Sequence, residues 1–141
     1  MTHPPSSSKT HRVLLVEDNA EDETLALRAL NRAGATLAVT VARDGLEANE
    51  KLRSATFDLV LLDLNLPHLH GLEVLRNLRS DPQTAELPVV VLTTSNEESD
   101  VRTSYQAGAN SFVRKPIDAR QYNEAILQIV RYWLVLNERR P

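Results

Sequence analysis

The chain has 141 residues, of which 42% are apolar and 25% are charged, and its formal net charge is −3. These values are typical of one globular domain, and the weakly acidic balance argues against nucleic acid or an anionic membrane as the main partner. The chain contains no cysteine, which excludes disulfides, thiol nucleophiles and iron–sulfur ligation. No apolar run approaches the ~20 residues of a membrane-spanning helix, and the polar start does not resemble a signal peptide. We therefore expect a cytoplasmic protein.

The predicted elements follow a polar N-terminal segment. Residues 1–11, with a Pro pair and a Ser triplet, are predicted to form a disordered lead, followed by one domain over 12–138 and a tail over 139–141. Short apolar runs then alternate with amphipathic stretches. The runs predict strands at 13–16, 37–41, 59–62, 89–92 and 111–113. The amphipathic stretches predict helices at 20–33, 44–54, 72–80, 95–108 and 118–138.

Two helix boundaries carry capping signals. Gly34 is the expected C-cap of the first helix, and Ser95 with Glu98 has the spacing of a capping box at the start of the fourth. Regular alternation of strand and helix indicates the α/β class, with a parallel sheet covered by helices on both faces. We predict a doubly wound, flavodoxin-like (βα)5 fold with strand order 2-1-3-4-5.

Polar side chains follow four of the predicted strands. Glu17 and Asp18 follow the first strand, Asp63 the third, Thr93 the fourth and Lys115 the fifth. Ligands of such sheets bind at the carboxyl ends of the strands, so these side chains should converge. Three adjacent carboxylates repel one another and need protons or a cation, and oxygen ligands without His or Cys suit Mg²⁺. A carboxylate nucleophile, Mg²⁺, a lysine and a hydroxyl are the parts that phosphoryl transfer requires.

Each signal has an ordinary interpretation when taken alone. Asp63 could be a turn residue, the segment 17–19 could only cap a helix, and a lysine before a proline is usually solvated. The joint occurrence at four strand ends favours the functional interpretation. The chain resembles the receiver domain of bacterial two-component response regulators over about residues 12–137. The resemblance rests on Glu17-Asp18, Leu61-Leu62-Asp63, Leu64-Asn65-Leu66-Pro67 with Gly71, Leu92-Thr93, Gly108-Ala109 and Lys115-Pro116.

The resemblance implies a phosphoacceptor and a metal site. Asp63 would accept a phosphoryl group from the phosphohistidine of a sensor histidine kinase. Asp18, Asp63 and the backbone carbonyl of Asn65 would bind Mg²⁺ or Mn²⁺ directly, and Glu17 would act through water. Such a protein signals and is not an enzyme in the usual sense, since it catalyses only its own phosphorylation and dephosphorylation.

The resemblance also implies a switch. Thr93 and Lys115 would hold the phosphoryl oxygens, and Thr93 would move toward the phosphate while Phe112 turns inward. The segments 16–19 and 132–137 are similar to those of small single-domain regulators that pair with bacterial phytochrome kinases, which implies a light or redox pathway. Few residues follow the fifth predicted helix, so we expect output through contact with other proteins.

Other functions remain open at this stage. A pseudo-receiver that binds partners without phosphorylation is the main alternative. A hydrolase of the haloacid-dehalogenase type needs a second acid two residues after its nucleophile, where this chain has Asn65. A flavin or dinucleotide would place its phosphate against the acidic pair 17–18, and the like charges would repel each other. A zinc site at His68 and His70 lacks a third soft ligand.

The fifth predicted helix suggests an assembly. Tyr122, Ala125, Ile126, Ile129, Val130 and Trp133 form one core stripe, but residues 132–136 are five consecutive apolar residues and surround more than one helical turn. A single stripe cannot bury them all, so part of this segment should be exposed on a monomer. We predict a homodimer through the fourth helix, the fifth strand and the fifth helix, as the resemblance also implies.

Overall fold

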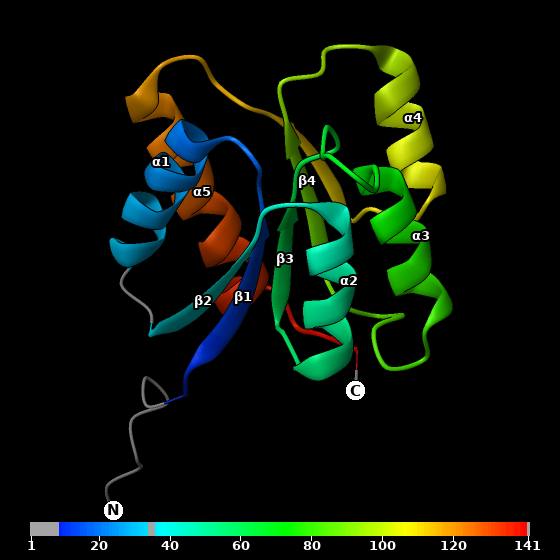
Figure 1. The fold of residues 1–141 in the computed structure, drawn as a ribbon. Helices are drawn as coiled ribbons and strands as arrows, with labels where there is room; N and C mark the ends of the chain where they lie inside the picture. Colours follow the sequence, from blue (N-terminus) through cyan, green and yellow to red (C-terminus); the bar gives the residue numbers. More distant parts are fainter. Residues whose placement is uncertain (1–8, 34–35, 141) are drawn as a thin grey trace, which may run out of the picture.

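A computed structural model describes residues 9–33 and 36–140. Five parallel strands form one sheet in the order β2-β1-β3-β4-β5, which confirms the predicted fold (Figure 1). The strands are β1 (His11–Val16), β2 (Leu37–Ala42), β3 (Leu59–Leu62), β4 (Val89–Thr93) and β5 (Ser111–Arg114). The helices are α1 (Ala20–Asn31), α2 (Gly45–Ser54), α3 (Gly71–Ser80), α4 (Glu98–Gln106) and α5 (Ala119–Val130), followed by a π-helical segment, Arg131–Leu136.

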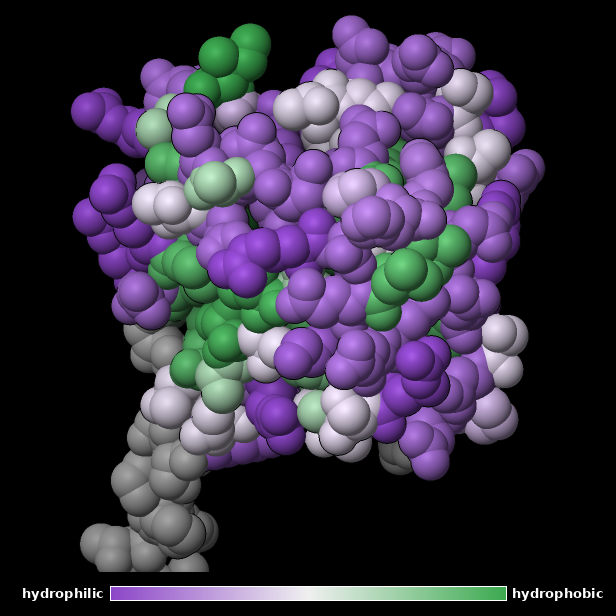
Figure 2. Space-filling view, in the orientation of Figure 1, coloured by the Kyte–Doolittle hydropathy of each residue, from purple (hydrophilic) through white to green (hydrophobic). Residues whose placement is uncertain are grey.

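The central strands are buried on both faces, which explains their continuous apolar runs. Figure 1 shows α1 and α5 on one face of the sheet and α2, α3 and α4 on the other. Alternate residues of each strand accordingly enter two separate cores. Leu15, Leu61 and Leu92 pack with α1 and α5, whereas Leu14 and Leu62 pack with α2 and α3. The edge strand β2 is only half-buried, and Figure 2 shows apolar surface over it.

The strand register brings the polar strand ends together. Val16 of β1 pairs with Leu62 of β3, and the backbone N–H of Asp63 donates to the carbonyl of Val16 at 3.1 Å. At the other side of the sheet, the backbone N–H of Lys115 donates to the carbonyl of Thr93 at 2.7 Å. The carboxyl ends of β1, β3, β4 and β5 therefore meet at one edge of the sheet.

Several predicted boundaries differ from the structure. Strand β1 begins at His11, inside the predicted lead, because the His11 N–H donates to the carbonyl of Thr36 at 2.9 Å and so joins β2. Residues 1–8 of the lead and the expected cap Gly34 lie outside the described residues. Helix α1 ends at Asn31, with Arg32 as its C-cap.

The predicted capping box of α4 is wrong. The helix begins at Glu98 with Glu97 as N-cap, and no side chain caps it. The hydroxyl of Ser95 instead donates to the carboxylate of Asp100 and accepts the backbone N–H of Glu97 at 3.3 Å. Ser95 therefore lies in the loop before α4 and contacts the first turn of the helix from outside.

The last predicted helix also ends differently. Regular α-helix stops at Val130, and the chain continues as a π-helix to Leu136, where Asn137 turns to extended backbone. Trp133 and Leu134 pack partly against the core shared by α1 and α5. The next two residues, Val135 and Leu136, are largely exposed. Within residues 9–33 and 36–140, no helix combines the length and the apolar character needed to cross a bilayer.

Candidate phosphoacceptor site

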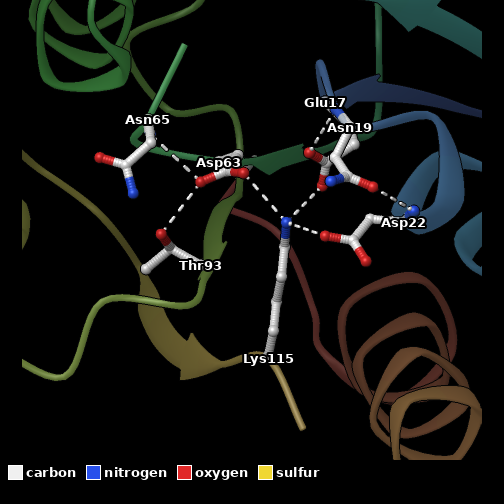
Figure 3. A network of polar contacts seen from close by, with 7 residues as sticks. All are labelled: Glu17, Asn19, Asp22, Asp63, Asn65, Thr93 and Lys115. Atoms are coloured by element: carbon white, nitrogen blue, oxygen red, sulfur yellow. Dashed lines mark hydrogen bonds and ion pairs between the residues drawn. The ribbon is translucent and has the colours of Figure 1, made fainter. Parts of the chain in front are cut away.

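The residues predicted to form the site lie together at the carboxyl edge of the sheet (Figure 3). Glu17, Asp63, Thr93 and Lys115 are the charged and polar side chains that the strand ends bury there. Each comes from a different strand end, so the fold and not a local motif assembles the site. Asp18 follows Glu17 and is exposed at the opening.

The carboxylate of Asp63 is held from two sides. Its Oδ1 accepts a hydrogen bond from the Thr93 hydroxyl at 2.9 Å and one from the Asn65 backbone N–H at 3.2 Å. Its Oδ2 accepts from Nζ of Lys115 at 2.9 Å. Since the side chain is almost fully buried, these contacts fix the direction in which its oxygens point.

A glycine keeps the backbone of Asp63 in place. The Gly71 N–H donates to the carbonyl of Leu64 at 2.9 Å, which closes the loop between β3 and α3. A Cβ at position 71 would lie 2.7 Å from Cα of Leu64 and still closer to the carbonyl oxygen of Asp63. This close approach explains why the loop has a glycine where α3 begins.

Lys115 is the internal counter-ion of the site. Its Nζ lies 2.6 Å from Glu17, 2.8 Å from Asp22 and 2.9 Å from Asp63, and only 4% of the side chain is exposed. Burial lowers the pKa of the ammonium, but hydrogen bonds and charges of its three carboxylate partners outweigh burial and raise that pKa. Lys115 thus stays protonated and offsets part of the repulsion predicted from the acidic cluster.

Asp22 was missed by the sequence analysis. It lies in the first turn of α1, where an acidic residue is common because it favours the helix N-terminus. The spacing to Asn19 signals only a helix cap and not the contact with Lys115: the Asn19 side chain accepts the Asp22 N–H at 3.0 Å. This cap orients Asp22 toward Lys115.

Glu17 is more deeply buried than its neighbour Asp18. Burial raises the pKa of Glu17 from 4.5 to about 7, although the hydrogen bond from Lys115 lowers it. Its second oxygen, Oε2, accepts the backbone N–H of Asn19 at 3.2 Å. The pKa of the Glu17 carboxyl therefore lies near neutral pH.

The acidic residues also fit a divalent cation. Among residues 9–33 and 36–140, one group of three potential metal ligands occurs, formed by Glu17, Asp18 and Asp63, with ligand atoms within 4.8 Å of one another. An oxygen-only donor set with an exposed member suits Mg²⁺ or Mn²⁺, which retain water ligands. The backbone carbonyl of Asn65 as a fourth ligand is still a prediction.

The remaining predicted residues lie around this centre. Phe112 of β5 is half-buried against the core of α2 and α3, and its backbone N–H donates to the Tyr105 hydroxyl at 3.2 Å. His68 and His70, the pair considered as a zinc site, have different roles in the structure. His70 caps α3 by accepting the Leu72 N–H at Nδ1, and His68 adopts a positive φ of 68° in the loop.

Comparison with known proteins agrees with this geometry. The model of the response regulator receiver domain matches residues 13–127. The chain is 37% identical over 131 residues to the probable methanogenesis regulatory protein FilR2 of Methanothrix harundinacea, covering 89% of this chain and 84% of the relative. It is 36% identical over 129 residues to the response regulator Rcp1 of Synechocystis, covering 86% and 88%.

Solved structures give the same result. The phosphorylated cyanobacterial phytochrome response regulator RcpA superposes with a TM-score of 0.90 at 36% identity, covering 94% of this chain and 100% of that one. The Mn²⁺-bound form of Rcp1 gives 0.85 at 33% identity, covering 93% and 99%. Fold, strand-end residues and sequence similarity extend over nearly the whole chain, and together they make this chain a member of the response regulator receiver domain family.

Proposed function

We propose that this chain is a response regulator whose Asp63 accepts a phosphoryl group from a sensor histidine kinase. The observation that carries the proposal is the arrangement of Asp63, a buried carboxylate with Thr93 on one oxygen and Lys115 on the other. A carboxylate placed only for stability would not need a group of further acids beside it, because like charges destabilise the folded state.

The chemistry follows from these contacts. One carboxylate oxygen of Asp63 attacks the phosphorus of the kinase phosphohistidine, and a P–O bond forms as the P–N bond breaks. The electron pair of the broken bond leaves with the imidazole, which takes a proton from water. The acyl phosphate adds oxygens within reach of Thr93 and Lys115, whose donors would transfer from the carboxylate to the phosphoryl group.

The proposed metal site is formed by Asp18 and Asp63 directly and by Glu17 through water, with the carbonyl of Asn65. Support comes from the clustering of the three carboxylates and from the Mn²⁺-bound form of the related Rcp1. When bound, Mg²⁺ or Mn²⁺ supplies positive charge to the phosphoryl oxygens. The residues of this chain would hold that cation beside the nucleophile.

We further propose that signalling uses protein contacts, with Thr93 and Phe112 as the switch. Thr93 contacts the phosphoacceptor, and Phe112 lies half-buried on the strand next to Thr93. The similarity to Rcp1 and RcpA favours a bacterial phytochrome as the kinase. A homodimer is supported by the exposed apolar side chains of Tyr132, Val135 and Leu136.

Phosphorylation by a small donor tests this proposal. The protein is incubated with acetyl phosphate and Mg²⁺, and its intact mass is followed over time. We expect the gain of one phosphoryl group, and no gain when a chelator removes the cation. A chain that stays unlabelled under conditions that label a known receiver domain would instead be a pseudo-receiver.

A further inference from the structure

The side chain of Lys115 has more carboxylate partners than the phosphoacceptor chemistry uses. Its ammonium has three N–H groups, and each is directed to a different carboxylate, those of Glu17, Asp22 and Asp63. Two of these partners belong to the group that could hold a metal ion, and Asp22 does not. Asp22 is thus the carboxylate partner of Lys115 that is not also a candidate metal ligand.

This difference between Asp22 and the other two partners becomes important when the site binds a cation and accepts a phosphoryl group. A divalent cation attracts the oxygens of Glu17 and Asp63 and competes with Lys115 for them. Phosphorylation of Asp63 then converts one of its oxygens into the bridging oxygen of an acyl phosphate, which is a poorer acceptor for the ammonium than a carboxylate oxygen. Lys115 would then exchange these partners for phosphoryl oxygens, and a four-carbon lysine side chain without one constant partner has many conformations available to it.

We propose that Asp22 is a positioning residue, which keeps Nζ of Lys115 beside Asp63 when the cation and the phosphoryl group engage Glu17 and Asp63. The inference rests on the proposed function and adds a residue to it. The contact is short, at 2.8 Å, and reaches from α1 to the loop after β5. In Figure 3, Asp22 approaches the lysine nitrogen from the side opposite to Asp63.

Asp22 is itself held in place. Its backbone N–H is accepted by the Asn19 side chain at 3.0 Å, while the backbone N–H of Asn19 donates to Glu17 at 3.2 Å. Three-quarters of the Asp22 side chain is buried, so the carboxylate is partly protected from competing water. The loop between β1 and α1 therefore fixes Asp22 and Glu17 as one unit against Lys115.

A purely structural role for Asp22 has a matched control. The first turn of α1 contains Glu21, Asp22 and Glu23, and any of them can favour the helix N-terminus. Glu21 is exposed, and the ion pairs of Lys115 are with Glu17, Asp22 and Asp63. Glu21→Gln therefore removes the same charge from the same turn without removing a partner of Lys115. An effect of Asp22→Asn that Glu21→Gln lacks belongs to the lysine contact.

The first test measures phosphorylation by acetyl phosphate with saturating Mg²⁺. We expect Asp22→Asn to lower the initial rate at least ~10-fold, as is common for residues that orient a ligand group, and Glu21→Gln to stay within ~2-fold of wild type. In a Lys115→Gln background, Asp22→Asn should produce no further loss. An Asp22→Asn rate equal to wild type, or an equal fold loss with and without Lys115, would overturn the proposal.

The second test does not depend on phosphorylation. Hydrogen exchange of the Lys115 ammonium is measured by ¹H–¹⁵N NMR in the presence of Mg²⁺, with circular dichroism to verify folding. Asp22→Asn should accelerate this exchange at least ~10-fold relative to wild type and to Glu21→Gln. An unchanged exchange rate would refute the positioning role, whereas an unlabelled wild type with accelerated exchange in the variant would refute only the proposed function.

Discussion

Lys115 brings one positive charge to three carboxylates, and this single side chain changes the expected energetics of the site. Repulsion among the three carboxylates alone predicts that neutralising Asp63 stabilises the metal-free protein. In the structure Asp63 forms an ion pair with Lys115 at 2.9 Å, so Asp63→Asn removes an attraction as well as a repulsion. We therefore expect the substitution to change the free energy of unfolding by less than ~1 kcal/mol.

The pKa of Glu17 predicts a pH dependence of stability. Its value of about 7 lies above the ordinary 4.5, so the folded state binds this proton more tightly than the unfolded state. The free energy of unfolding should then fall as the pH rises from 4.5 through 7, by ~3 kcal/mol without metal. Urea unfolding of wild type and Glu17→Gln at several pH values measures it, and parallel pH profiles for the two proteins would contradict the assignment.

A second residue-level prediction concerns the cation. Mg²⁺ should raise the melting temperature, because ligand binding to the folded state stabilises it by ~1.4 kcal/mol at ten times the dissociation constant. Asp18→Asn should abolish this shift and leave the metal-free melting temperature nearly unchanged, since Asp18 is exposed and belongs to the metal-binding group. Differential scanning calorimetry decides it, and a Mg²⁺ shift of wild-type size in the variant would exclude Asp18 as a ligand.

At the scale of elements, strands were easier to predict than helix ends. Strands buried on both faces need continuous apolar runs, and that pattern depends little on the rest of the molecule. Helix ends depend on tertiary contacts. Ser95 has a good capping-box spacing, but its hydroxyl contacts the side chain of Asp100, and α4 begins without a side-chain cap. The π-helical turn after Val130 has no local sequence signal of its own.

Burial of α3 gives a prediction for element stability. Leu75 is fully buried between α3 and the sheet, whereas Leu46 on α2 is 57% exposed. Leu75→Glu should destabilise the fold by ~4 kcal/mol or more, because it buries an unpaired charge, and Leu46→Glu should cost under ~0.5 kcal/mol. Chemical denaturation of both variants measures the difference, and equal stabilities would mean that α3 does not pack as described.

At the scale of the whole molecule, the fold and most of the site could be predicted because both depend on strand ends. The strand order places four segments at one edge, and their residue types identify the chemistry. Asp22 could not be predicted in this way. Its contact requires the Lys115 side chain to extend from the end of β5 to α1, and no local pattern encodes that reach.

The proposed homodimer is the prediction at this scale. Tyr132, Val135 and Leu136 are 49%, 62% and 58% exposed, whereas Leu134 packs partly against the core. Val135→Glu is therefore a better test of the interface than Leu134→Glu, which would also disturb the fold. Analytical ultracentrifugation at micromolar concentration should give a dimer for wild type and a monomer for Val135→Glu. A monomeric wild type would contradict the dimer.

The central claim is that Asp63 carries the phosphoryl group. Wild type, Asp63→Asn and the matched control Asp81→Asn, which lies at the far end of α3, are incubated with acetyl phosphate and Mg²⁺ and weighed by intact mass spectrometry. We predict one added phosphoryl group on wild type and on Asp81→Asn, and none on Asp63→Asn. Labelling of folded Asp63→Asn to the level of wild type would contradict the account.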